Sequence, residues 1–349
     1  TLPASLADLT FLEIADFRSC NLSGEVPDLS SISTLEKFDI SSNKFSFGDL
    51  ETHFTSNSTI PDFRYKPQNT LDAEITFEPV LGTNYTLSLT PDTGSNISYQ
   101  WYKKRETADQ NIIIPGATSS SYDILNIQSD DLDAYTCEIT SSIIPDLTIY
   151  RSTINLTGPV SQQEKDALIA FYNALDGPNW TDNTNWLSTE PVSTWSFIKT
   201  RGNKVIGIET FNNNVGFNGQ LPTEIGDLVH LEELDIAIET GLTGPLPTTI
   251  GNLTKMQELR LQGTSNSGEI PASIGNLSEL RILRFLANNF TGALPSTIGN
   301  LTELRSMEIP GDLFNFGGGV ELANNFSGQI PSTLGNLINL EILNLNRNS

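Results

Sequence analysis

Basic residues are scarce in this chain of 349 residues. Lys and Arg number 19 against 42 Asp and Glu, which gives a formal net charge of −23. Nucleic acids and anionic membrane surfaces are bound through clustered Lys and Arg side chains. The charge balance therefore excludes binding to nucleic acid and predicts partners of another chemical class.

Long apolar runs and cysteines are also few. No stretch approaches the roughly 18–20 apolar residues of a membrane span, so no membrane insertion is expected. The first residues, TLPASLADLT, lack the basic and apolar regions of a targeting signal. Cys20 and Cys137 are the only cysteines, and a disulfide framework is excluded. Hydrophobic residues make up 37%, enough for packed cores.

Catalytic motifs are missing. The two histidines, His53 and His230, do not lie in H-E-x-x-H, and neither G-x-S-x-G nor a phosphate-binding glycine loop occurs. We therefore predict no enzyme activity, no catalytic residues, no metal-ligating residues and no cofactor. The one alternative kept open is Ca²⁺ at the acidic segment 129–133, since carboxylates are hard oxygen ligands.

What the sequence does contain is a repeat. The phrase Gly-x-(apolar)-Pro recurs at six positions, ending at Pro27, Pro222, Pro247, Pro271, Pro295 and Pro331. The last five prolines are spaced by 25, 24, 24 and 36 residues, and Pro3 stands 24 before Pro27. A Gly and a Pro in every unit exclude one long helix, so each unit must be a coil that buries its leucines by stacking.

This phrase resembles the plant-type leucine-rich repeat, as in IPASIGNLSELRILRFLANNFTG. The resemblance implies one short strand per coil and an asparagine ladder that bonds neighbouring coils, with Asn288 and Asn324 in it. Cys20 takes the ladder position of the first block, and we expect it to be a buried structural thiol.

The repeat phase is absent between about 70 and 156. Short β-rich runs separated by turn residues predict a β-sandwich there. Trp101 and the phrase Asp133-x-Tyr135-x-Cys137 resemble the immunoglobulin fold, in which Tyr135 would form a tyrosine corner and Asp133 would be tied by an Arg. The partner cysteine is replaced by Leu87 or Leu89, so Cys137 is expected to be a small buried hydrophobe.

A tryptophan-rich stretch follows the sandwich. Its start, EKDALIAFYNALDGPNW, has apolar residues at helical spacing and a Gly-Pro stop. It resembles the capping segment of bacterial leucine-rich-repeat proteins, in which Trp180 and Trp186 would cover the first coil. A sugar-stacking aromatic site is the alternative.

These segments predict an α/β leucine-rich-repeat solenoid, mostly β strands with short helical turns. It comes in two blocks that are separated by an all-β immunoglobulin-like sandwich. The expected domains are the end of a repeat block at 1–66 with a linker over 63–68, the sandwich at 67–158, the cap at 159–205, and repeats at 206–349 with an insertion at 310–320. Both ends interrupt a repeat, so the sequence is expected to be a fragment of a longer chain.

Candidate binding residues lie in two places. By resemblance, the outward positions of the repeat strands form the binding face; they include Glu233, Asp235, Glu258, Arg260, Ile282, Arg284, Ser306, Glu308, Ile342 and Asn344. The alternative is that these charges only pair across strands. Phe314 and Phe316, beside three glycines in the insertion, are either folded back or offered to a partner.

A ladder of hydroxyls follows the repeat prolines at Thr223, Thr249, Ser273, Thr297 and Thr333. Such a ladder is also found on ice-binding solenoids. We expect these residues instead to be N-cap acceptors of the helical turns.

The sequence as a whole predicts a non-enzymatic extracellular segment of a large repetitive bacterial surface protein, acting in adhesion or in an attachment appendage. Its expected partner is a protein or glycan on a cell surface, with homo-oligomeric assembly possible. The alternatives are a receptor-like ectodomain that binds a peptide or glycan on the repeat face, and a secreted polysaccharide-binding module.

Overall fold

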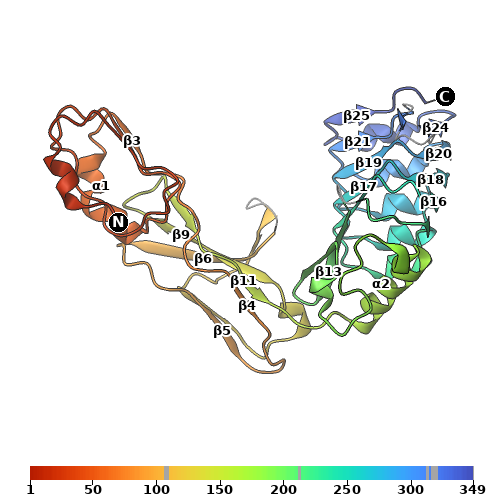
Figure 1. Ribbon diagram of the computed structural model, residues 1–349, viewed down its shortest axis with the longest axis horizontal. Coiled ribbons are helices and arrows are strands. Elements are labelled where there is room, and N and C mark those ends of the chain that lie inside the picture. The colour runs from red at the N-terminus through yellow and green to blue at the C-terminus, as the bar shows by residue number, and fades with distance from the viewer. Residues whose placement is uncertain (106–109, 211–213, 312–313, 316–320, 349) are drawn as a thin grey trace. The chain divides into compact units, whose positions relative to one another are not determined.

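A computed structural model describes residues 1–349 except 106–109, 211–213, 312–313, 316–320 and 349. The described chain is mostly β and forms two compact units, unit 1 (Thr1–Gly158) and unit 2 (Pro159–Ser349) (Figure 1). Among the described residues the α-helices are α1 (Phe47–Asn57) and α2 (Gln162–Ala174). No helix in that part of the chain has the length and apolar content that a membrane crossing requires.

Unit 1 begins with a short solenoid. The 3₁₀ helix η1 (Ala4–Asp8) is followed by three strands that pair in parallel and in order: β1 (Ile14–Asp16), β2 (Lys37–Asp39) and β3 (Asp62–Arg64). Asn43 joins the coils, because its Nδ2 donates to the carbonyl of Phe17 and its Oδ1 accepts from the N–H of Leu22. This segment is therefore a stack of coils.

The predicted linker at 63–68 is wrong. Phe63 lies in β3, opposite Phe38 in β2, and the Gln68 amide bonds the backbone of Phe45 and Ile40 as a further rung of the ladder. This coil could not be predicted from the repeat phrase, because α1 takes the place of the Gly-x-apolar-Pro phrase in it. The strand and the ladder position nevertheless remain.

The expectation that Cys20 is buried is also wrong, because its side chain is exposed. A ladder side chain bonds the coil that precedes its own, as Asn43 does when its Oδ1 accepts the N–H of Cys20 at 3.0 Å. Among the described residues, no coil stacks on that side of Cys20, and its thiol is exposed.

The rest of unit 1 is a β-sandwich. Its larger sheet has the order β4-β11-β9-β6-β7 with β10 paired to β9, and β5 and β8 form a separate pair. The strands are β4 (Ile75–Phe77), β5 (Tyr85–Ser88), β6 (Ile97–Lys103), β7 (Ile112–Ile113), β8 (Ser121–Ile124), β9 (Ala134–Ser141), β10 (Thr148–Tyr150) and β11 (Ile154–Leu156), with the 3₁₀ helix η3 (Ser129–Asp131) before β9. The immunoglobulin-like classification of this segment stays a prediction.

The sandwich and the short solenoid share one core. Ile139, Ile144 and Ile149 of the β9–β10 hairpin belong to the same buried cluster as Phe38 and Phe45 of the coils. The β9–β10 hairpin thus covers the end of the stack.

The N-terminus of α1 makes a polar contact with the sandwich. The Asp92 carboxylate accepts the N–H groups of Phe47 at 3.1 Å and Gly48 at 3.0 Å, where the helix dipole favours an anion. A Cβ on Gly48 would lie 1.9 Å from Thr93 Oγ1, so only glycine permits this approach.

Unit 2 is a longer solenoid. Its seven-stranded sheet has the order β12-β13-β15-β17-β19-β21-β25, parallel except for the β12–β13 pair. The bounds are β12 (Ile198–Arg201), β13 (Lys204–Glu209), β15 (Glu233–Ala237), β17 (Glu258–Gln262), β19 (Ile282–Leu286), β21 (Ser306–Glu308) and β25 (Ile342–Asn344). Leu259, Leu283 and Met307 point inward from this sheet and are fully buried.

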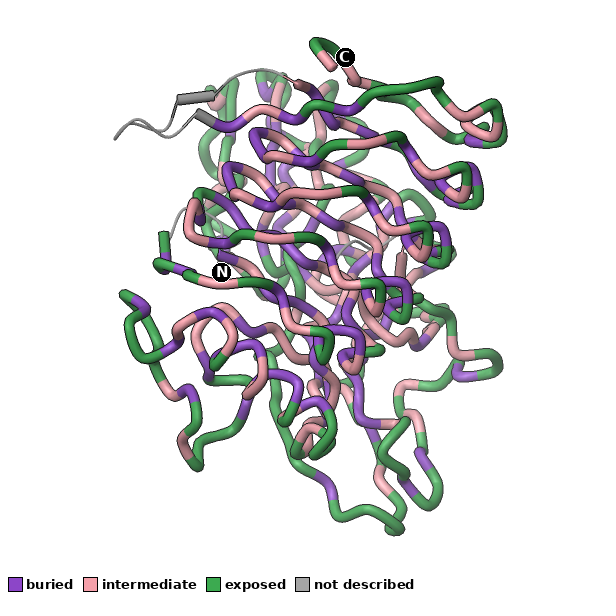
Figure 2. Tube along the Cα trace, turned by 90° about the vertical axis from the view of Figure 1, so that its right-hand side faces the viewer, coloured by how far each residue is buried: buried purple, intermediate pink, exposed green. Residues whose placement is uncertain are grey.

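A second side of the solenoid is a five-stranded sheet. It consists of β14 (Gly219–Gln220), β16 (Leu242–Gly244), β18 (Ser265–Gly268), β20 (Asn289–Gly292) and β24 (Asn325–Phe326). Between the two sheets run the 3₁₀ helices η6 (Thr223–Asp227), η7 (Thr248–Asn252), η8 (Ala272–Asn276), η9 (Ser296–Asn300) and η10 (Ser332–Asn336). Buried residues line the inside of the coils, and exposed residues concentrate at their turns (Figure 2).

The hydroxyl ladder does not cap these 3₁₀ helices, contrary to expectation. Each N-cap residue is the repeat proline, without a side-chain cap bond. The hydroxyl of Thr297 instead donates to the carbonyl of Ala272 in the preceding coil at 2.6 Å. Thr249, Ser273 and Thr333 make the equivalent bond. These hydroxyls therefore hold neighbouring coils together.

The first coil of unit 2 is covered by α2 and an aromatic cluster. Trp180 and Trp186 are about 95% and 93% buried, and their rings meet edge to face with centroids 5.2 Å apart. Phe171 of α2 and Trp195 pack against Trp186. The short helices η4 (Gly177–Asn179) and η5 (Val192–Thr194) connect these residues. Because both rings are inside the cluster, they present no open face for a sugar.

The insertion after β21 contains two short strands, β22 (Phe314–Asn315) and β23 (Glu321–Leu322), which pair antiparallel. Phe314 begins the first of them. Phe316, the other candidate contact residue of this loop, lies outside the described residues.

Candidate functional site

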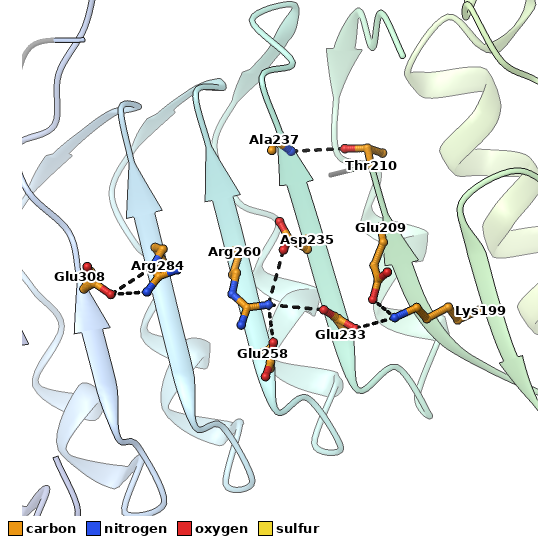
Figure 3. A network of polar contacts seen from close by, with 10 residues as sticks. All are labelled: Lys199, Glu209, Thr210, Glu233, Asp235, Ala237, Glu258, Arg260, Arg284 and Glu308. Carbon is orange, nitrogen blue, oxygen red and sulfur yellow. Dashed lines mark hydrogen bonds and ion pairs between the residues drawn. The ribbon is translucent and has the colours of Figure 1, made fainter. Parts of the chain in front are cut away.

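A network of charged side chains lies on the outward face of the seven-stranded sheet of unit 2 (Figure 3). We call it the charged strip. Its members are Lys199, Glu209, Glu233, Asp235, Glu258, Arg260, Arg284 and Glu308.

The strip follows from the strand register. Glu233 lies opposite Glu258 on the next strand, and two residues further on Asp235 lies opposite Arg260. Alternate residues of a strand share one face. A 24-residue period therefore returns each outward position to the same side of the sheet.

Arg260 is the centre of the strip. Its Nη1 lies 3.4 Å from Glu233 Oε1 and 3.4 Å from Asp235 Oδ2, and it also contacts Glu258. Arg260 stands opposite Arg284 in the register. Arg284 pairs with Glu308 on the other side, with Nε 3.0 Å from Oε1. The two arginines thus bond acids on opposite sides.

Lys199 closes the other end of the strip. Its Nζ contacts Glu209 and lies 3.2 Å from Glu233 Oε2. Burial, followed by the hydrogen bond and repulsion from Glu209, raises the pKa of Glu233 to about 8. Burial acts to raise the pKa of Glu209, but the hydrogen bonds from Glu233 and Lys199 outweigh it and lower this pKa. The pKa values of these two neighbouring carboxyl groups are therefore shifted in opposite directions.

A pH dependence of stability follows. A carboxyl group whose pKa is higher in the folded state binds a proton more tightly there, so its contribution is complete below the unfolded value and is lost as the pH rises through the folded value. The groups that face Glu233 are Lys199, Glu209, Asp235, Glu258 and Arg260. Burial also raises the pKa of Asp235, in the same direction.

We therefore expect the free energy of unfolding of unit 2 to fall between about pH 5 and pH 8. Tryptophan fluorescence during urea unfolding measures it, because Trp180, Trp186 and Trp195 belong to unit 2. Glu233→Gln should flatten the slope, whereas Glu279→Gln, at an exposed pair with Lys255, should keep it. An unchanged slope in Glu233→Gln would contradict the assignment.

Of the residues predicted to contact a partner, Glu258, Arg260, Arg284 and Glu308 lie together in the charged strip. The alternative of cross-strand pairing is also present, since all four are in ion pairs. The sequence analysis missed Lys199 and Glu209. They stand before the first complete repeat, so the period did not point to them.

The predicted structural residues of the sandwich lie near one another. Trp101 on β6 is opposite Cys137 on β9, and both are fully buried. The Tyr135 hydroxyl donates to the carbonyl of Asp131 at 2.6 Å. Asp133 forms an ion pair with Arg105, whose Nη1 lies 3.2 Å from Oδ1. One carboxylate of the segment 129–133, considered above for Ca²⁺, therefore already has a cationic partner. No three His, Cys, Asp or Glu side chains in the described ranges are grouped so that they could hold a metal ion.

The two thiols differ sharply in accessibility. Cys20 is exposed, whereas burial raises the pKa of the Cys137 thiol to about 12. A thiol reagent acts on the thiolate, so we expect the native chain to react at Cys20 only and Cys137 to react after unfolding in urea. Titration with an aromatic disulfide measures this. Fast reaction of a Cys20→Ser variant would contradict it.

The interior ladder of unit 2 contains Asn288 and Asn324 as predicted positions, both buried. Asn288 Nδ2 donates to the carbonyl of Leu261 at 2.8 Å, and Asn324 Oδ1 accepts from the N–H of Phe290 at 3.2 Å. The sequence analysis missed Glu239, which takes the same place and accepts three backbone N–H groups from residues 215–217. Burial raises the pKa of Glu239, although these donors lower it.

Solved structures similar to this chain include a plant ice-binding protein, with 26% identity over 52% of this chain and 54% of that protein and a TM-score of 0.43. PEPR1 in complex with AtPEP1 shows 28% identity over 53% of this chain and 28% of that one, with a TM-score of 0.44. The ectodomain of the receptor kinase SOBIR1 from Arabidopsis thaliana shows 20% identity over 54% of this chain and 95% of its own, with a TM-score of 0.44.

This chain spans about half the length of the ice-binding protein and less than a third of PEPR1. No curated protein matches the sequence. A family model described as a leucine-rich repeat region matches residues 213–349. The matched residues include the stacked coils that carry β15, β17, β19, β21 and β25.

Proposed function

We propose that this chain is a non-enzymatic extracellular segment that binds a protein or glycan on a cell surface through the charged strip of unit 2. We further propose that it belongs to a large repetitive bacterial surface protein and acts in adhesion or in a cell-attachment appendage. In this proposal the β-sandwich of unit 1 is immunoglobulin-like.

The observation that carries the proposal is the position of the charged strip. Its side chains project from the face of the sheet that lies opposite the packed leucines, so the core does not require them. Charged groups on a rigid sheet are already oriented, which lowers the entropy lost on binding.

Repetition supports the adhesive role. Each coil contacts only its neighbours, so a solenoid grows by adding units without a new fold. A chain that alternates coils with β-sandwich segments extends its reach in the same way. Lateral assembly of several copies would require specific interfaces, because the net charge of −23 opposes indiscriminate association.

The second candidate is a receptor-like ectodomain that binds one peptide or glycan on the same strip. The continuity of the strip across six neighbouring strands, β12 to β21, favours it, since an extended ligand could cross all of them. An adhesin predicts saturable binding to whole cells, whereas a receptor predicts one high-affinity soluble ligand.

The test is binding of the fluorescently labelled chain to intact cells, with and without Ca²⁺. We expect saturable binding that Arg284→Glu reduces at least tenfold. The control Arg305→Glu makes the same charge change at an exposed residue outside the strip and should leave binding within twofold. Absence of saturable binding to any cell type would contradict adhesion, and equal loss in both variants would contradict the strip as the contact.

A further inference from the structure

We infer that the charged strip binds its partner through a lysine or arginine side chain that the partner supplies between Glu233 and Glu258. This inference rests on the proposed function and names the chemistry of the contact.

The first step is the charge balance at this end of the strip. Glu209, Glu233, Asp235 and Glu258 contribute four carboxyl groups, and the cations in contact with them are Lys199 and Arg260. Among the described residues, two cations therefore contact four acids, and ionisation of all four carboxyl groups would leave an excess of two negative charges.

The second step is the geometry of Arg260. All three of its ion pairs, to Glu233, Asp235 and Glu258, are made by one nitrogen, Nη1. A guanidinium carries five N–H donors in a planar fork and bonds a carboxylate best with two of them. One nitrogen of Arg260 therefore contacts three carboxylates. A second cation beside these carboxylates would take over some of the contacts.

The third step is an orphan acceptor. The Oδ1 atom of Asp235 is buried and has no hydrogen-bond donor among the described residues, and the residue is only 7% exposed. A buried carboxylate oxygen without a donor costs free energy. If Arg260 turned its fork fully onto Asp235, it would satisfy Oδ1 and release Glu233 and Glu258 for another cation.

Once released by Arg260, Glu233 and Glu258 are positioned to bind this second cation. Glu233 and Glu258 are direct partners on neighbouring parallel strands, where main chains lie about 4.8 Å apart. Their side chains keep 16% and 29% exposure, so a ligand can reach them from solvent. Two carboxylates at that spacing flank an ammonium or guanidinium group, and the negative field of the chain attracts basic partners.

A proton is expected to leave when the cation binds. Burial and the neighbouring Glu209 raise the pKa of Glu233 to about 8, and a cation beside Glu233 favours its ionised form. Binding should therefore release up to one proton at pH 7, and affinity should rise from pH 6 to pH 8.

The experiment is calorimetric titration of the full chain with tetralysine and with the same-length peptide of norleucine. Two buffers of different ionisation enthalpy measure proton release. We expect tetralysine to bind with proton release, and norleucine peptide not to bind. Glu233→Gln/Glu258→Gln should weaken binding at least tenfold and abolish the release.

The matched control is Glu303→Gln/Glu341→Gln, which removes the same charge at exposed residues outside the strip. It should stay within twofold of the parent chain. An equal loss of tetralysine binding in both double variants would mean that the peptide is attracted only by the overall negative charge, and it would overturn the inference. Displacement of tetralysine by micromolar Ca²⁺ would also overturn it. If the strip double variant does not fold, Glu258→Gln alone should still weaken binding several-fold, and no change would overturn the inference.

These outcomes are separable from failure of the proposed function. If Glu233→Gln/Glu258→Gln binds cells normally while Arg284→Glu does not, the cell contact stands and the cation site is wrong. If neither the parent chain nor any variant binds cells, the proposed function fails, whereas the tetralysine result still decides the cation site.

Discussion

Asn43→Ala is expected to lower the free energy of unfolding of unit 1 by about 2–4 kcal/mol, since each buried group left without a hydrogen bond costs about 1–3 kcal/mol. Asn43 is fully buried. Its Oδ1 accepts the N–H groups of Cys20 and Leu22, both at 3.0 Å. Its Nδ2 donates to the carbonyls of Phe17 at 2.8 Å and Ile40 at 3.0 Å. Alanine would remove these four bonds and a fifth, from Nδ2 to the Ser41 carbonyl at 3.2 Å, and water would replace them only at the partly exposed groups.

The full chain is unfolded in urea, and the unfolding of unit 1 is measured by hydrogen–deuterium exchange in peptides that come from that unit. Asn69→Ala is the matched control: Asn69 is exposed, and its Nδ2 donates only to the Ser42 carbonyl, at 2.8 Å. Its loss should cost less than about 1 kcal/mol. Equal costs for the two variants would show that the ladder does not join the coils.

Gly275→Ala is expected to destabilise unit 2 by about 1–3 kcal/mol, the usual cost of overpacking a filled site. A Cβ on Gly275 would lie 2.4 Å from the Thr297 carbonyl oxygen and 2.6 Å from Thr297 Cβ in the next coil. Gly226, Gly251 and Gly299 stand in the same relation to Thr249, Ser273 and Thr333. These four glycines therefore set how closely a coil stacks on the next one.

The chain contains its own control for this prediction. Gly335 has the same sequence context in η10, yet a Cβ there would meet nothing within 4 Å. Gly335→Ala should not destabilise, because alanine is favoured over glycine in a helical turn by up to about 1 kcal/mol. Thermal unfolding followed by tryptophan fluorescence compares the two. A loss in Gly335→Ala as large as in Gly275→Ala would refute the stacking explanation.

The period of the repeat predicted the interior of unit 2. Each coil was expected to bury its leucines by stacking, and Leu277, Leu280 and Leu283 are fully buried. The same expectation fails in part in the first coil of unit 1, because Leu9 is 49% exposed. A template position is buried only where a neighbouring coil covers it.

Local patterns misled where the contact partner is distant in the sequence. The hydroxyls after the repeat prolines fit an N-cap pattern, but they bond to the preceding coil. Gln68 and Glu239 do not match the Asn of the ladder, so no motif marked them. The docking of Asp92 onto the N-terminus of α1 joins residues more than 40 positions apart and leaves no periodic signal.

The sequence by itself determined which side chains of each repeat turn inward, because a coil with alternating strand residues and a helix-breaking Gly and Pro has one way to bury its leucines. It also determined that Glu258, Arg260, Arg284 and Glu308 point outward. Only the tertiary structure decided which acid shares which cation. The strand register brings Glu233 beside Glu258, and the β12–β13 turn brings Lys199 to Glu209. Charge pairing depends on distances of a few ångströms between separate coils, and spacing along one chain does not fix those distances.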